Sequence, residues 1–67
     1  MNSDQFQGQW QQMKGSIKQH WAKLTDDDVT YIDGALDRFL GRLQERYGVH
    51  REEADRLVKK WLEDRPA

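Results

Sequence analysis

The apolar residues of this 67-residue chain recur every three or four positions, and this spacing restricts its fold more than any other feature. The first run has separations of 4, 3, 4, 4 and 3 residues and consists of Phe6, Trp10, Met13, Ile17, Trp21 and Leu24. Such spacing places side chains on one face of an α-helix. No stretch shows the alternation of a half-buried strand, and the single proline is second from the end. The sequence therefore predicts an all-α fold.

Helix start and stop signals divide the rest of the chain. Thr25 is a typical N-cap, and Asp28 stands where a capping box needs an acceptor, so we expect a short helix from about Asp26. Acidic residues in its first turn would also stabilise the helix through its dipole. The next apolar stripe ends before Gly48, a frequent residue just after a helix. The last helix should begin at 50–51 and end at 65–67. We expect three buried tryptophans in the core: Trp10, Trp21 and Trp61.

A shift of 26 residues brings the chain into register with itself. Gly8 then falls on Gly34, Gly15 falls on Gly41, and both the apolar stripe and the acidic helix start keep their character. Helical periodicity alone does not explain the matched glycines. The pattern predicts one domain, 1–67, made of two packed helical hairpins with approximate internal duplication, with repeat units at roughly 8–32 and 34–58.

Composition narrows the possible functions. Eleven basic residues face twelve acidic ones, whereas binding driven by nucleic-acid phosphates normally needs a basic excess. With a mean hydropathy of −1.10, the chain has no apolar run that could span a membrane. The absence of cysteine excludes disulfides, thiolate zinc sites and thiol nucleophiles. No basic segment followed by an apolar one opens the chain, so we expect a cytoplasmic protein without membrane contact. We also expect a monomer.

Three segments carry a more specific signal: GQWQQMKG at 8–15, WAKLTDDD at 21–28 and LQERYG at 43–48. They are similar to the G-x-W-x-x-x-K-G, W-x-K-L-T-D-D-D and I-Q-x-R-Y-G segments of the bacterial CsbD-like family. Leu43 here replaces the isoleucine, and Met13 replaces an aromatic residue. The resemblance covers nearly the whole chain. It implies two roughly orthogonal helical hairpins and expression linked to general stress, and it supplies no catalytic residues.

No group of residues has the spacing of a catalytic or metal site. Consecutive helical residues such as 26–28 point about 100° apart, so these carboxylates would not converge on a metal ion. His20 and His50 have no ligand partner at i+3 or i+4, and no serine or threonine has a histidine and an acid placed to activate it. We therefore predict no catalytic residue, no metal site and no cofactor.

The basic residues support only a weak alternative. Those of the second half, Arg38, Arg42, Arg46, Lys59 and Lys60, alternate with acidic residues, which favours a solvated surface with salt bridges. The N-terminal part is mildly basic through Lys14, Lys18 and Lys23. Exposed tryptophans could also stack on bases, although their helical spacing favours the core. Weak nucleic-acid binding is therefore the alternative function, with nucleic acid disfavoured as a partner.

Two glycines fall where helices should have no glycine. Gly15 and Gly41 are expected in mid-helix, where each costs about 1 kcal/mol relative to alanine. The simplest interpretation is close approach by another helix of the domain. The alternatives are a flat seam for a partner, glycines tolerated without a role, and misplaced helix ends. We define a candidate interaction surface as Gln12, Gly15, Gln19 and Gly41. The predicted function is that of a non-enzymatic stress-response protein, either a protectant or a protein-interaction module.

Overall fold

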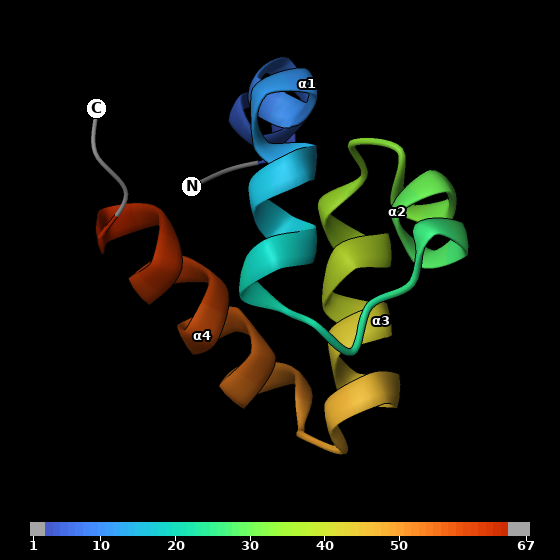
Figure 1. The fold of residues 1–67 in the computed structure, drawn as a ribbon. Coiled ribbons are helices and arrows are strands. Elements are labelled where there is room, and N and C mark those ends of the chain that lie inside the picture. The colour runs from blue at the N-terminus through green and yellow to red at the C-terminus, as the bar shows by residue number, and fades with distance from the viewer. Residues whose placement is uncertain (1–2, 65–67) are drawn as a thin grey trace.

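A computed structural model describes residues 3–64, and this part of the chain forms four α-helices without a strand. They are α1 (Ser3–His20), α2 (Asp26–Ile32), α3 (Leu36–Tyr47) and α4 (Arg51–Asp64) (Figure 1). The predicted all-α fold is confirmed, as are the starts of the second and last helices and the end of the third. The expected end of the last helix, at 65–67, lies outside the described residues.

Helix α3 is the central element of the fold. It contacts each of the other three helices, and contacts also join α1 to α2. In Figure 1, α1 and α3 run side by side, α2 lies on the far flank of α3, and α4 runs obliquely away from the lower end of α3. The chain passes α3 on its way from α1 to α2 and then returns from α2 into α3 (Figure 1).

The core is built around the predicted aromatic residues. Trp10, Trp21 and Trp61 are 5%, 4% and 8% exposed, which confirms that all three are buried. The ring centre of Trp21 lies 5.1 Å from that of Phe39 and 4.8 Å from that of Trp61, in edge-to-face geometry. Trp21 therefore brings α4 into contact with the core formed by α1 and α3.

The end of the first helix differs from the prediction. The apolar stripe continues to Leu24, but α1 ends at His20, and 21–24 form a turn in which the Leu24 amide donates to the Trp21 carbonyl at 3.0 Å. Trp21 and Leu24 are nevertheless buried. A turn can keep a side chain on the apolar side of the chain, so periodicity predicted the burial of these residues but not their backbone conformation.

Two glycines have a clear backbone role. Gly34 has φ +81°, and a Cβ there would lie 3.4 Å from Trp10, so this turn needs both left-handed backbone and a close approach. Gly48 follows α3 with φ 66°, and its amide donates to the Gln44 carbonyl at 2.9 Å, as expected for a helix C-terminus. Both positions fix where α3 begins and ends.

The internal duplication stays a prediction. The two proposed units pair helices of unequal length, since α1 has 18 residues against 12 in α3, and α2 has 7 against 14 in α4. Gly15 and Gly41 both lie inside helices, as the 26-residue register requires. Gly8 lies within α1, however, whereas Gly34 lies in the turn before α3.

Candidate interaction surface

Gly15 and Gly41 do not mark a close approach between helices. Both are exposed, and a Cβ built on either would meet nothing within 4 Å beyond the backbone of its own helix. The interpretation that another helix of the domain packs closely against them is therefore wrong. Their mid-helix placement is confirmed, so each leaves a flat, open stretch of helix surface.

The structure divides the candidate interaction surface between two helices. Gln12, Gly15 and Gln19 are exposed residues of α1, spaced so that they share one helical face. Gly41 lies on α3 and lines a hollow between α2 and α3. No residue of α1 is among its lining residues. That hollow therefore includes one of the four predicted residues.

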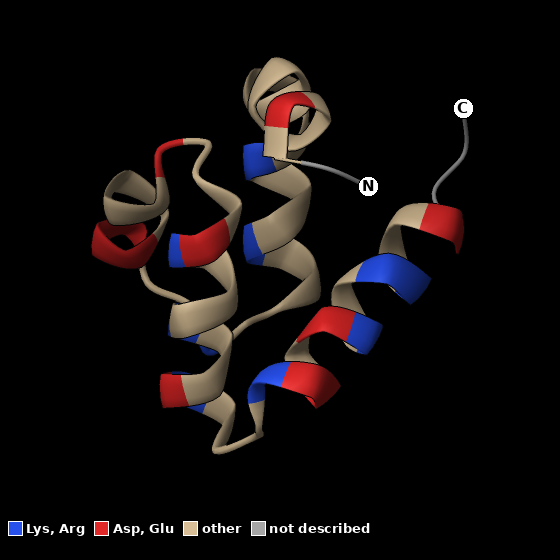
Figure 2. Cartoon of the chain, turned by 180° about the vertical axis from the view of Figure 1, so that it is seen from behind, with Lys and Arg blue, Asp and Glu red and all other residues tan. Residues whose placement is uncertain are grey.

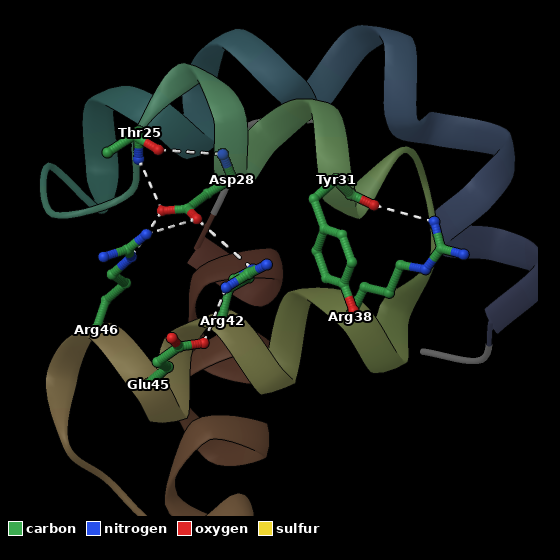
Figure 3. Close-up of polar contacts among 7 residues, drawn as sticks. All are labelled: Thr25, Asp28, Tyr31, Arg38, Arg42, Glu45 and Arg46. Atoms are coloured by element: carbon green, nitrogen blue, oxygen red, sulfur yellow. Dashed lines mark hydrogen bonds and ion pairs between the residues drawn. The ribbon is translucent and has the colours of Figure 1, made fainter.

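This α2–α3 hollow has a volume of about 330 Å³ and is lined by Tyr31, Asp37, Arg38, Gly41, Arg42 and Glu45. Tyr31 is 47% exposed. The guanidinium carbons of Arg42 and Arg38 lie 4.2 and 5.2 Å from the centre of its ring, which are cation–π distances. In the view of Figure 3, the Tyr31 ring stands between these two arginines. Sequence reasoning named Gly41 but missed the aromatic and cationic groups around it.

Asp28 is the most strongly constrained polar residue beside the hollow. It is 2% exposed, and its carboxylate accepts from Arg46 Nε at 2.9 Å and from Arg46 Nη2 at 3.0 Å (Figure 3). Asp28 Oδ2 also accepts from the Thr25 amide at 3.0 Å, while the Asp28 amide donates to Thr25 Oγ1 at 3.1 Å. These two bonds form the predicted capping box.

The ion pair fixes the charge of Asp28. The hydrogen bonds from Arg46 lower the pKa of the Asp28 carboxyl to about 2 against the opposing effect of burial, with the Thr25 amide assisting. Asp28 in turn raises the pKa of Arg46. The capping role was predicted, but the pairing with α3 was missed. The signal was the arginine spacing 38, 42, 46, which places three cations on the face of α3 that meets the acidic start of α2.

Arg42 links this ion pair to the hollow. Its Nε lies 3.6 Å from Asp28 Oδ1 without making a hydrogen bond, and its Nη1 donates to Glu45 Oε2 at 2.9 Å. The prediction of a solvated surface with salt bridges is thus incomplete, because Arg42 and Arg46 both approach a buried carboxylate. The remaining cation of the stripe, Arg38, donates from Nη1 to the Tyr31 carbonyl at 3.0 Å.

Two of the three basic residues named in the first half, Lys18 and Lys23, have partners within the fold. Lys18 pairs with Asp26, and the Lys23 ammonium lies 5.1 Å from the centre of the Tyr47 ring. Along α4, basic and acidic residues alternate (Figure 2), and Lys59 pairs with Asp55 at 3.1 Å. Pairing with acidic residues weakens the attraction of these cations for phosphates, so they add no support to the nucleic-acid alternative.

Histidine and acidic side chains are the groups of this chain that could ligate a metal ion. Within residues 3–64, no three histidine, cysteine or acidic side chains are grouped so that they could hold a metal ion. The His20 ring packs against Trp21 and Trp61, with centre distances of 4.4 and 5.8 Å. Over the same part of the chain, no helix is long and apolar enough to span a membrane.

Comparison with known proteins assigns the chain to a family. The family model described as CsbD-like matches residues 4–56. The chain belongs to the CsbD-like family. It is 54% identical over 61 residues to a UPF0337 protein of Pectobacterium atrosepticum, covering 91% of this chain and 88% of the relative. The UPF0337 protein YjbJ of Escherichia coli is 48% identical with the same coverage of both chains. No solved structure matches.

Two of the three family-like segments contact each other in the folded chain. Segment 21–28 supplies Thr25 and Asp28, and segment 43–48 supplies Arg46, which pairs with Asp28. The Tyr47 hydroxyl also accepts from the Lys23 amide at 3.3 Å. The two segments therefore hold α2 against the end of α3. Their most distinctive polar residues are used in packing and capping, which leaves the exposed helix surfaces as the candidate site of activity.

Proposed function

We propose that this CsbD-like protein is a non-enzymatic stress-response protein that acts through its exposed surface, as a protectant or as a small protein-interaction module. The observation that carries the proposal is the open space above Gly15 and Gly41 in the middle of two helices. A mid-helix glycine costs about 1 kcal/mol relative to alanine. No neighbouring helix requires either glycine, and contact with a partner would account for the lack of a side chain at these two positions.

The state of Asp28 supports a non-enzymatic function. A buried carboxylate is the natural candidate for a general base, which works best with a pKa near the operating pH. Arg46 and Thr25 occupy both carboxylate oxygens of Asp28, and its pKa is lowered to about 2. This group is therefore a poor proton acceptor near neutrality and serves as a structural anion.

The surface chemistry supports a protective role. Charged residues make up 34% of the chain, the formal net charge is −1, and the mean hydropathy is −1.10. The many charged side chains keep the surface hydrated, and the near-zero net charge gives little attraction to partners of either charge sign. We further propose that the protein works as a cytoplasmic monomer whose partners are other proteins.

The test is survival of cells under drying and osmotic stress. A strain lacking the gene is complemented with the wild type, Gly15→Leu or Gly41→Leu, at equal protein levels. The control is Lys60→Leu, which adds the same side chain to an exposed position of α4. We expect the wild type and the control to restore survival and at least one glycine variant to fail. Full restoration by both glycine variants would contradict a surface role for these positions.

A further inference from the structure

We propose that the α2–α3 hollow binds a carboxylate side chain of a protein partner, with Arg38 as the principal contact. This assignment rests on the proposed function, since it presupposes that the protein acts by contacting other proteins. It goes further by naming the place of contact and the chemistry that the partner must present.

The charges in the hollow point to Arg38. Both acidic residues of the lining already have partners, because Asp37 accepts from Arg51 at 2.6 Å and Glu45 accepts from Arg42 at 2.9 Å. Arg38 has no carboxylate partner among residues 3–64; its one hydrogen bond is to the Tyr31 carbonyl at 3.0 Å. A guanidinium has five N–H donors, so the Arg38 group keeps donors for a further acceptor. An incoming carboxylate would complete the charge pairing of the hollow.

The shape of the hollow suits a side chain with an apolar stem. Arg38 and Arg42 cover the faces of the Tyr31 ring, but the side chain is half-exposed, so part of it stays open beside Arg38. Gly41 places no side chain in the space of about 330 Å³. The methylene groups of a glutamate can lie against the open part of this ring while the carboxylate meets the guanidinium. Gly41 thereby gains a reason to be glycine in mid-helix, because a larger residue would occupy the approach to Arg38.

The hollow already contains one example of this chemistry. Glu45 holds Arg42 in an exposed pair within the same helix, which shows a carboxylate bound to a guanidinium of the lining. The two acidic residues of the rim also select against a polyanion, since successive phosphates of a nucleic acid would approach Asp37 and Glu45. A single carboxylate brings only one negative charge, so the repulsion is smaller than for a run of phosphates.

The experiment is an NMR titration of the full-length, ¹⁵N-labelled protein with two blocked tetrapeptides, acetyl-Ala-Leu-Glu-Ala-amide and its glutamine analogue. The Arg38 side-chain Nε–H signal and the Gly41 amide signal report on the hollow, and the Gly15 amide signal is the internal control. We expect the glutamate peptide to shift the first two signals with about tenfold higher affinity than the glutamine peptide, because a charge-assisted hydrogen bond is added. Equal affinity for the two peptides would overturn the proposal.

Two variants test the named residues in opposite directions. Arg38→Gln should remove the preference for the glutamate peptide, whereas Glu45→Gln should strengthen binding, because it removes a competing carboxylate and leaves Arg42 available. Lys60→Gln, on α4, is the matched control and should change nothing. An unchanged preference in Arg38→Gln overturns the proposal, as does tighter binding of a six-nucleotide thymidine oligonucleotide at the same signals.

The binding site in the hollow and the proposed stress function can be disproved separately. If neither peptide shifts the hollow signals while Gly15→Leu still abolishes stress survival, the hollow assignment is wrong and the surface function stands. If the glutamate peptide binds as expected while removal of the gene leaves survival unchanged, the hollow binds carboxylates but the proposed stress function is wrong.

Discussion

Asp28 combines two structural tasks in one side chain. It completes the capping box of α2 with Thr25 and holds Arg46 of α3 through two hydrogen bonds. The sequence predicted the first task because capping is local and depends on residues three positions apart. It did not predict the second, because Arg46 lies 18 positions away and only the folded arrangement brings it to Asp28.

Replacing Asp28 with asparagine should make stability insensitive to the titration of this group. The folded-state pKa of about 2 lies below the ordinary 3.8, so ionised Asp28 stabilises the wild type above about pH 4, and this contribution is lost as the pH falls through 2. We expect Asp28→Asn to lower the free energy of unfolding by about 2 kcal/mol at pH 7. The gap between the two proteins should narrow between pH 4 and pH 2 in urea titrations. A gap that stays constant over this range would contradict the assigned ion pair.

Thr25 allows a second test of the α2 capping box, with a smaller expected effect on stability. Thr25→Ala removes the hydroxyl that accepts from the Asp28 amide, and loss of such an N-cap costs about 1 kcal/mol. Thr25→Ser keeps the hydroxyl and should recover most of the loss, as measured by urea denaturation. Equal destabilisation by both substitutions would show that the methyl group, and not the cap, is what matters at this position.

At the scale of elements, periodicity predicted helix identity better than helix ends. The third helix ends as expected because Gly48 supplies a local stop signal with left-handed backbone. The first helix ends at His20, and the residues around it include neither glycine nor proline to mark the stop. The helix stops there because the chain must turn at 21–24 to reach Thr25. This turn depends on the packing of the whole fold, so no single residue in the sequence marks it.

Gly41 inside α3 and Gly48 at its C-cap are a matched pair of glycines for testing this difference. Gly41→Ala should raise the free energy of unfolding by up to about 1 kcal/mol, because the position is helical and open. Gly48→Ala should lower it by about 1 kcal/mol, because its φ of 66° is unfavourable for alanine. Thermal denaturation of the two single variants measures both effects. Changes of the same sign would show that one of these backbone assignments is wrong.

Trp21 tests how the elements share the core. It lies beyond the end of α1 and packs against Phe39 of α3 and Trp61 of α4. Trp21→Ala should therefore cost about 3–5 kcal/mol, a large fraction of the stability of a small domain. Leu57→Ala, at an exposed position of α4, is a control that should cost much less. A nearly wild-type denaturation midpoint for Trp21→Ala would contradict its place in the core.

For the whole molecule, the core could be predicted from the sequence, whereas the α2–α3 hollow could not. The core followed from the spacing of Trp10, Trp21, Trp61 and their apolar neighbours, because burial follows helical periodicity. The α2–α3 hollow could not be predicted, because it depends on how α2 lies across α3. The duplication of the two hairpins stays a prediction. The candidate surface was predicted residue by residue, and the structure separates it over α1 and α3.

The central claim is that the mid-helix glycines lie on an open surface available to partners. The most direct measurement is the free energy of unfolding of Gly15→Ala and Gly15→Leu relative to the wild type. Nothing lies within 4 Å of the missing Cβ, so we predict that neither variant is less stable than the wild type. The free energy of unfolding should rise by up to about 1 kcal/mol. A leucine variant less stable than the wild type by more than about 1 kcal/mol would show that Gly15 belongs to internal packing, and would contradict the claim.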